Sequence, residues 1–176
     1  MKILDKEFDV FIPAEEIDSI VCHLASEVNR DFKDKNPYFL VMMNGAFMFA
    51  SDFLRKITIR NKLSFIKYKS YNGMQSSGKV VPEMMIPSDV KDRDVVIIED
   101  IVDTGLTMQA FLEDLKQFQP RSVSIVSFLM KPDTLKCKFP VKYLGKAIEN
   151  KFVVGYGLDY DDEGRELGDL YILKEN

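Results

Sequence analysis

The stretch from Val95 to Met108 limits the possible folds of this chain more than any other part of it. It opens with the four β-branched apolar residues Val95–Ile98, which are too few for a helix and are typical of a strand buried on both faces. Three carboxylates, Glu99, Asp100 and Asp103, follow within five residues. The sequence therefore predicts a buried strand that runs directly into an acidic turn.

A helix is predicted just after that turn. Apolar residues recur at the helical period over 108–115, and Thr107 is the predicted N-cap. The free backbone N–H groups at such a helix start point back at the turn, where they can bind an anion.

An anion site beside three carboxylates makes chemical sense for a sugar phosphate. Backbone N–H groups and the hydroxyls of Thr104 and Thr107 can hold a phosphate monoester. Glu99 and Asp100 can accept hydrogen bonds from ribose hydroxyls, or reach a hydrated Mg²⁺ bound to the same ligand. A purely structural interpretation stands beside this one, because a Thr-Gly turn can simply lead into a helix.

The pattern Glu-Asp-x-x-Asp-Thr-Gly-x-Thr at 99–107 resembles the phosphoribosyl pyrophosphate signature of the type I phosphoribosyltransferases, and it matches at every defining position. The resemblance implies an α/β fold with a mostly parallel sheet flanked by helices, a small hood and a mobile loop. It implies Mg²⁺ as cofactor, Glu99 and Asp100 as ribose-diol and metal residues, and Asp103 as acceptor of the purine proton. It also implies a 5-phosphate loop made of Asp103, Thr104, Gly105, Leu106 and Thr107.

Composition narrows the class of partner. The net charge of −4 and pI near 5.1 argue against nucleic acid or an anionic membrane as a partner, and no apolar run approaches the roughly 18 residues of a membrane span.

Cys22 and Cys137 lack metal-ligand spacing, so we expect two small buried thiols in a reducing cytoplasm. A chain of 176 residues without repeats or composition breaks predicts one domain, 1–176.

Two further predicted strands end in polar residues. Phe39–Met43 runs into Asn44-Gly45 and a helix, and Ser122–Met130 runs into Lys131, which the following proline keeps extended. Helices between the strands predict a parallel sheet, whose ligands bind outside the carboxyl ends of its strands. We therefore expect these residues and the acidic turn at one edge of the sheet.

The Asn44-Gly45 turn has two interpretations. Asn-Gly is a common turn dipeptide by itself, but near the signature its backbone N–H groups can hold the departing pyrophosphate. In the six-oxopurine phosphoribosyltransferases that the chain resembles, the matching turn is usually Lys-Gly, often with a cis peptide between the two. Because Asn44 carries no charge, any pyrophosphate contact is expected through the main chain.

A long polar segment, residues 71–79, follows the predicted strand Leu63–Ser70. Ser70-Tyr71 resembles the pair that heads the mobile loop of the family, expected here at about 70–82, which closes over the reaction centre. A plain hairpin connection is the alternative.

The segment Lys151–Tyr160 resembles the base-binding hood of the hypoxanthine-guanine phosphoribosyltransferases, and we expect the hood to comprise the N-terminal lead and about 138–176. By resemblance, Phe152 stacks on the purine and Val153 meets its edge through the main chain. Asp159 matches a residue near a second Mg²⁺ and the pyrophosphate, and Arg165 matches a pyrophosphate contact.

Lys131 indicates the class of base. It matches the donor to the oxygen on purine carbon 6, and an ammonium, with three donors and no acceptor, suits that oxygen and disfavours the amino group of adenine. Taken singly, Lys131 as a solvated lysine and Phe152 as a core residue are the plainer interpretations.

The expected function is purine salvage, with Mg-dependent transfer of phosphoribosyl from phosphoribosyl pyrophosphate to hypoxanthine and guanine. Two alternatives stay open: a nucleotide-sensing regulator that keeps the signature and binds nucleic acid, and a xanthine-preferring enzyme. The acidic balance and the hood residues favour the first function. A homodimer or homotetramer is expected from the resemblance alone.

Overall fold

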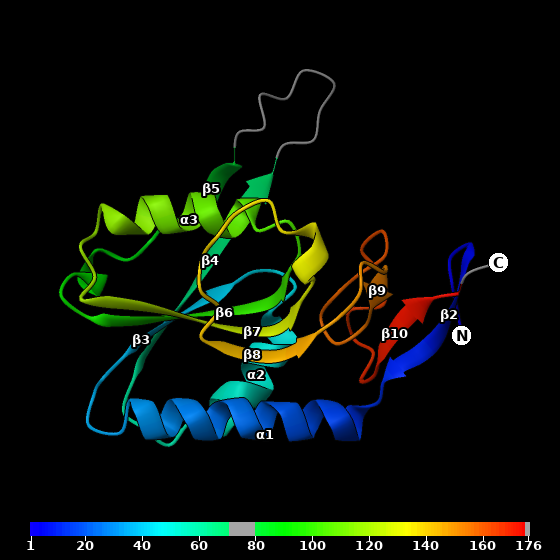
Figure 1. The fold of residues 1–176 in the computed structure, drawn as a ribbon, viewed down its shortest axis with the longest axis horizontal. Coiled ribbons are helices and arrows are strands. Elements are labelled where there is room, and N and C mark those ends of the chain that lie inside the picture. Colours follow the sequence, from blue (N-terminus) through cyan, green and yellow to red (C-terminus); the bar gives the residue numbers. More distant parts are fainter. Residues whose placement is uncertain (71–79, 175–176) are drawn as a thin grey trace.

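The computed structural model describes residues 1–70 and 80–174, which form two sheets and three α-helices (Figure 1). Within these ranges the larger sheet has six strands, in the spatial order β5 (Val80–Met84), β4 (Lys62–Ser70), β3 (Tyr38–Met42), β6 (Asp94–Val102), β7 (Ser122–Met130) and β8 (Tyr143–Ala147). All neighbours are parallel except β4 and β5, which are antiparallel. The predicted α/β class with a mostly parallel sheet is confirmed.

Helices cover both faces of this sheet. Helices α1 (Ala14–Asp31) and α2 (Phe47–Arg55) lie on one face, and α3 (Leu106–Lys116) lies on the other (Figure 1). Two short 3₁₀ helices, η1 (Ser88–Val90) and η2 (Pro132–Thr134), precede β6 and follow β7.

The alternation of side chains along β6 connects two hydrophobic cores. Val96 and Ile98 pack in the core beneath α1 and α2, whereas Val95 and Ile97 pack in the core beneath α3, and all four are fully buried. A strand buried on both faces loses apolar surface on each side, which explains its continuous run of β-branched residues.

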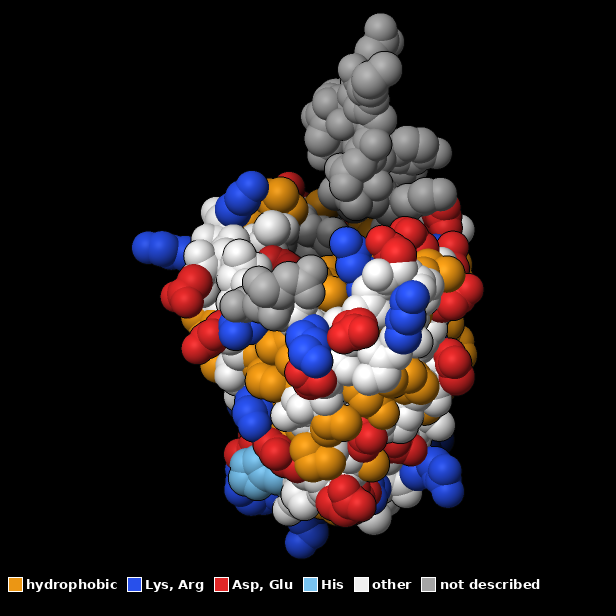
Figure 2. Space-filling model, turned by 90° about the vertical axis from the view of Figure 1, so that its right-hand side faces the viewer, with side chains coloured by type: hydrophobic (Ala, Val, Ile, Leu, Met, Phe, Trp, Pro, Cys, Tyr) orange, Lys and Arg blue, Asp and Glu red, His pale blue; other side chains and the backbone are white. Residues whose placement is uncertain are grey.

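The two ends of the chain form the second, antiparallel sheet, which we call the hood. Its strands follow the order β1 (Lys2–Ile3), β2 (Lys6–Ile12), β10 (Leu170–Leu173) and β9 (Val153–Val154). The hood stands beyond the carboxyl ends of the parallel strands (Figure 1). Figure 2, which views the molecule from that end, shows acidic and basic side chains interspersed among the described residues of this face.

Several local expectations were wrong. Strand β6 continues to Val102 because it stays paired with β7, so Glu99 and Asp100 lie within the strand instead of in a turn. Helix α3 begins at Leu106, and its N-cap is Gly105 with φ 77°, not Thr107. A glycine takes that left-handed conformation without a steric penalty. Because glycine has no side chain, the first turn of the helix is not capped by a hydroxyl at this position.

Two further corrections concern the cysteines. Cys22 is exposed on α1 and Cys137 is partly exposed in the loop after β7, so neither is the buried thiol we expected. Helix periodicity explains Cys22, because the buried stripe of α1 contains its neighbour Val21. A cis peptide joins Met43 to Asn44, one residue before the bond that is often cis in the family. No helix in the described part of the chain is long and apolar enough to cross a membrane.

Candidate active site

Three parallel strands end at the edge of the sheet that faces the hood. Strand β3 leads to Asn44, β6 leads to the loop that begins at Asp103, and β7 leads to Lys131. Because β6 lies between β3 and β7, the three polar ends converge as the sequence predicts.

The phosphate loop predicted at 103–107 encloses a small cavity of about 100 Å³. Pockets for whole ligands usually exceed roughly 300 Å³, so this cavity suits a single phosphate group better than a nucleotide. Its lining includes, among the predicted residues, Glu99, Asp103, Thr104, Gly105 and Thr107. Leu106 does not line it, and its side chain is 48% exposed.

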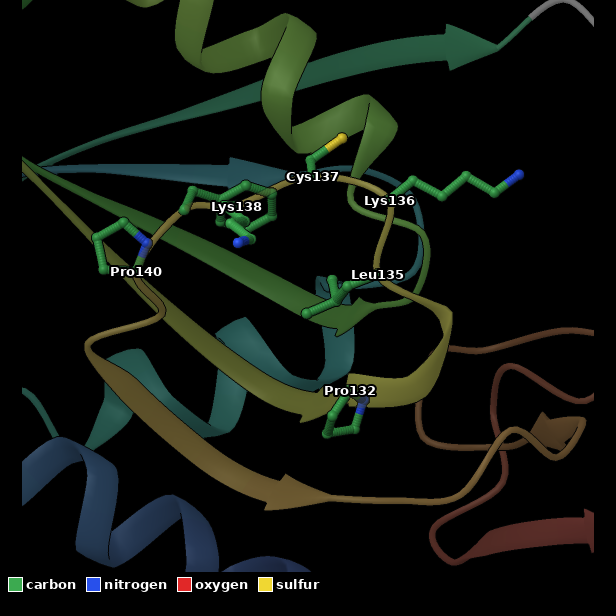
Figure 3. A pocket seen from close by; sticks show the side chains of 7 residues that line it. Pro132, Leu135, Lys136, Cys137, Lys138 and Pro140 are labelled. Atoms are coloured by element: carbon green, nitrogen blue, oxygen red, sulfur yellow. The ribbon is translucent and has the colours of Figure 1, made fainter.

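An arch formed by residues 132–140 supports the phosphate loop from outside (Figure 3). The backbone N–H of Lys136 donates to the carbonyl of Thr104 over 2.9 Å. A Cβ added to Gly105 would lie 2.9 Å from the ring of Phe139, so the arch also limits this position to glycine. The arch borders a larger cavity of about 600 Å³, whose lining contains none of the predicted site residues.

A third cavity, of about 190 Å³, lies between the sheet edge and the hood. Its lining consists of Ile101, Asp103, Lys131, Phe152, Val153, Leu158 and Asp159. Five of these seven are predicted site residues: Asp103, Lys131, Phe152 and Val153 for the purine and its proton, and Asp159 for a second Mg²⁺ and the pyrophosphate. Sequence reasoning missed Ile101 and Leu158, although each is an apolar neighbour of a predicted acid, because a local pattern does not separate a cavity wall from core.

An ion pair joins two of the three charged residues of this cavity, Lys131 and Asp103. The Nζ atom of Lys131 lies 2.9 Å from an oxygen of Asp103, and the lysine side chain is only 9% exposed against 44% for the aspartate. The interpretation of Lys131 as a solvated lysine is therefore wrong. Burial opposes ionisation of Asp103, but hydrogen bonds from Lys131 and Thr134 outweigh it and lower the pKa of Asp103.

The Asn44-Gly45 turn, predicted to bind pyrophosphate, is closely packed. A Cβ on Gly45 would lie 1.6 Å from an oxygen of Asp100, and a Cβ on Gly157 of the hood would lie 2.0 Å from the carbonyl oxygen of Gly45. The guanidinium of Arg165 donates to the Gly157 carbonyl over 2.8 Å. Asp100, the turn and the hood loop therefore meet at one point.

Asp159 and Arg165 form an ion pair at that point, with 2.7 Å between nitrogen and oxygen. The other oxygen of Asp159 accepts from the backbone N–H of Asp162 over 2.9 Å. Each oxygen of Asp159 therefore already has one polar contact in the free protein.

Glu99 and Asp100 occupy opposite faces of β6. Glu99 shares the parity of Ile97 and lines the phosphate cavity, whereas Asp100 shares the parity of Ile98 and lies against Gly45. These adjacent acids have different neighbours because successive side chains of a strand point to opposite faces. Sequence patterns do not reveal this, since they place the end of a strand only to within a few residues.

Both carboxyls are held in environments that oppose their charge. Burial, then the neighbouring charge of Asp100, raises the pKa of Glu99 well above its usual value. Burial likewise raises the pKa of Asp100 to about 6, and Arg165 offsets part of that effect. One oxygen of Glu99 is buried with no hydrogen-bond partner in the described structure.

These acids fit a Mg²⁺ that arrives with a phosphorylated ligand. No group of three or more His, Cys, Asp or Glu residues within 1–70 and 80–174 is arranged to hold a metal ion. Mg²⁺ commonly takes one or two carboxylates and completes its shell with water and substrate phosphates. The unpartnered oxygen of Glu99 and the destabilised charge of Asp100 suit that limited donor set.

The mobile-loop prediction falls mostly outside the described residues. Ser70 ends β4, where its backbone pairs with Val80, and Tyr71 belongs to the segment that the structure does not describe.

The family is shown by comparison with known proteins. A model of the phosphoribosyl transferase domain matches residues 13–161. The chain belongs to the phosphoribosyltransferase family. It is 38% identical over 172 residues to the hypoxanthine-guanine phosphoribosyltransferase of Dictyostelium discoideum, covering 95% of this chain and 96% of the relative. A Staphylococcus aureus enzyme of the same name is 35% identical, with 94% and 93% covered.

Solved structures agree with this phosphoribosyltransferase over nearly its whole length. A hypoxanthine-guanine phosphoribosyltransferase from Bacillus anthracis superposes with a TM-score of 0.89 at 28% identity, covering 97% of this chain and all of the other (100%). A hypoxanthine phosphoribosyltransferase from Staphylococcus aureus has the same TM-score of 0.89 at 35% identity, with 94% and 91% covered. The chain is therefore a phosphoribosyltransferase enzyme with the fold of these relatives.

Proposed function

We propose that this phosphoribosyltransferase performs purine salvage, transferring ribose 5-phosphate from phosphoribosyl pyrophosphate to hypoxanthine and guanine to give IMP, GMP and pyrophosphate. The observation that carries the proposal is that Asp103 lines both the phosphate cavity and the cavity with Lys131 and Phe152. A ribose bridging those two cavities would carry its 5-phosphate in one and its base in the other.

The cavity of about 190 Å³ that Lys131 and Phe152 line, which we call the base cavity, suits a six-oxopurine. The partly exposed ring of Phe152 offers a stacking surface, and Lys131 offers only donors, which match an oxygen on carbon 6. In the free enzyme one of those donors binds Asp103. When the purine oxygen takes a Lys131 donor, Asp103 becomes available to accept the proton of the purine imidazole.

The proposed reaction breaks the bond from sugar carbon 1 to pyrophosphate and forms a bond from that carbon to a purine nitrogen. The purine imidazole proton leaves toward Asp103 while positive charge develops on the sugar. Mg²⁺, when bound, would supply positive charge to the pyrophosphate oxygens. Glu99 and Asp100, which lie on opposite faces of β6, would each hold such an ion from their own side, directly or through water. The backbone of Asn44 and Gly45 and the side chain of Arg165 would contact the departing pyrophosphate.

Wider features of the proposal follow the relatives. We propose a single domain, 1–176, with a loop at about 70–82 that closes over the site during turnover. We also propose that the enzyme acts in the cytoplasm as a homodimer or homotetramer on small molecules. Analytical ultracentrifugation would report the assembly.

The test is turnover of hypoxanthine, guanine, xanthine and adenine with phosphoribosyl pyrophosphate, with and without Mg²⁺. We expect hypoxanthine and guanine to react, adenine to be inert, and a chelator to abolish turnover. Efficient use of adenine would contradict the role of Lys131. A preference for xanthine would select the alternative enzyme, and tight RNA or DNA binding without turnover would select the regulator.

A further inference from the structure

The proposed purine-stacking ring, Phe152, is supported from behind by two other aromatic rings. Phe152 is 44% exposed and lines the base cavity. The ring of Tyr160 meets it edge-on, with centroids 5.8 Å apart and planes at 82°. The ring of Phe8, from strand β2, lies 6.3 Å away and is fully buried. One side of Phe152 is therefore packed and the other is open.

Tyr160 is itself anchored to the N-terminal end of the chain. Its hydroxyl donates to an oxygen of Asp5 over 2.7 Å. This hydrogen bond lowers the pKa of Asp5 and raises the pKa of Tyr160 to about 12. Asp5 lies in the two-residue turn between β1 and β2, so the hairpin of the chain's first strands reaches over to the hood loop.

The backbone around Tyr160 is equally constrained. The backbone N–H groups of Tyr160 and Glu163 each donate to the other's carbonyl, over 2.9 and 3.1 Å. The ring also lies 6.2 Å from Phe8. Tyr160 is thus fixed by a tight turn, by a buried ring and by the carboxylate of Asp5.

We infer that Tyr160, held by Asp5, is a positioning residue that sets the ring plane of Phe152 for the incoming purine. The inference rests on the proposed function, because it assumes that Phe152 stacks on the base. An aromatic ring turns about only two side-chain bonds, so an edge-on neighbour restricts it to the plane that stacking requires. A ring already held in that plane loses less freedom when the purine binds.

A positioning role predicts a particular kinetic signature. Stacking holds the base in both the ground state and the transition state, so weakening it raises the KM for the base and leaves kcat unchanged. Tyr160 directly follows Asp159, so a variant that displaced Asp159 would instead raise the KM for phosphoribosyl pyrophosphate. The two substrates therefore separate the positioning role from a general disturbance of the hood.

The experiment compares Tyr160→Phe and Asp5→Ala with Tyr171→Phe. Tyr171 is a matched control because its hydroxyl also donates to an aspartate of the hood, Asp169, over 3.2 Å. We expect the first two variants to raise the KM for hypoxanthine roughly two- to tenfold, the range expected from the loss of one hydrogen bond. Asp5→Asn, which keeps an acceptor for the Tyr160 hydroxyl, should restore the wild-type KM.

A rise in the KM for hypoxanthine that exceeds any rise in the KM for phosphoribosyl pyrophosphate, with both KM values unchanged in Tyr171→Phe, would support the inference. An unchanged hypoxanthine KM in Tyr160→Phe, or a rise matched by Tyr171→Phe, would overturn it while wild-type turnover still upheld the proposed function. If calorimetry and kinetics showed that the wild-type protein neither binds nor uses any purine, both claims would fall together.

Discussion

Replacing Gly157 with alanine should disrupt the contact between the hood and the pyrophosphate turn. Gly157 has φ 100°, and its missing side chain lets the carbonyl oxygen of Gly45 approach to 2.0 Å from the Cβ position. The neighbour is backbone and cannot swing away, so alanine requires the hood loop or the turn to move. Arg165, which donates to the Gly157 carbonyl, must move with the loop.

Two separate costs set the magnitude. An L side chain at a positive φ of this kind costs about 1–3 kcal/mol, and overpacking in a closely packed site costs about 1–3 kcal/mol more. The free energy of unfolding should therefore fall by about 2–6 kcal/mol. For a domain of this size the corresponding fall in Tm is roughly 5–20 °C.

The assay is thermal and urea unfolding followed by circular dichroism, with Gly168→Ala as the control. A Cβ on Gly168, another hood glycine, would meet nothing within 4 Å, so that variant should unfold within about 0.5 kcal/mol of wild type. In kinetics, Gly157→Ala should raise the KM for phosphoribosyl pyrophosphate more than the KM for hypoxanthine. Equal stability of the two variants would refute the packing argument.

Three further predictions concern the polar residues of the site. Asp103→Asn should lower kcat roughly a hundredfold or more with little change in the Kd for phosphoribosyl pyrophosphate, and equal losses in single-turnover and binding assays would contradict its role as proton acceptor. Lys131→Ala should lower kcat/KM for hypoxanthine roughly ten- to hundredfold, the value of a charge-assisted hydrogen bond, while exposed Lys138→Ala should not. Glu99→Gln should raise the Tm of the free enzyme by roughly 2–10 °C at a pH high enough to ionise Glu99, because it removes a buried unpartnered charge. Folding raises the pKa of Glu99, so the stability of the wild-type protein falls as the pH rises through the pKa that Glu99 has in the folded state. Calorimetric scans should therefore show the higher Tm of Glu99→Gln only at high pH.

Short-range patterns in the sequence were enough to predict the fold class and the edge of the sheet at which the candidate site residues meet. The run Val95–Ile98 predicted a strand buried on both faces because such a strand needs apolar side chains at both parities. The alternation of strands and helices predicted a mostly parallel sheet, and such a sheet brings the ends of β3, β6 and β7 to one edge.

Boundaries and caps were less predictable. Strand β6 extends through Glu99 and Asp100 because β7 continues to offer backbone partners, which a window centred on β6 does not contain. Gly105, not Thr107, precedes α3, because a left-handed turn packed against Phe139 decides where the helix can begin.

By itself, the sequence predicted a βα corner whose residue types suit a phosphorylated sugar, since strand, acids and turn are contiguous and interact locally. Only the tertiary structure decided that Asp103 belongs to two cavities, that Lys131 is buried against it, and that Asp5 reaches Tyr160. Those contacts join residues 28 and 155 positions apart along the chain. They exist because burying apolar surface brings distant segments together, and local periodicity carries no record of which segments will meet.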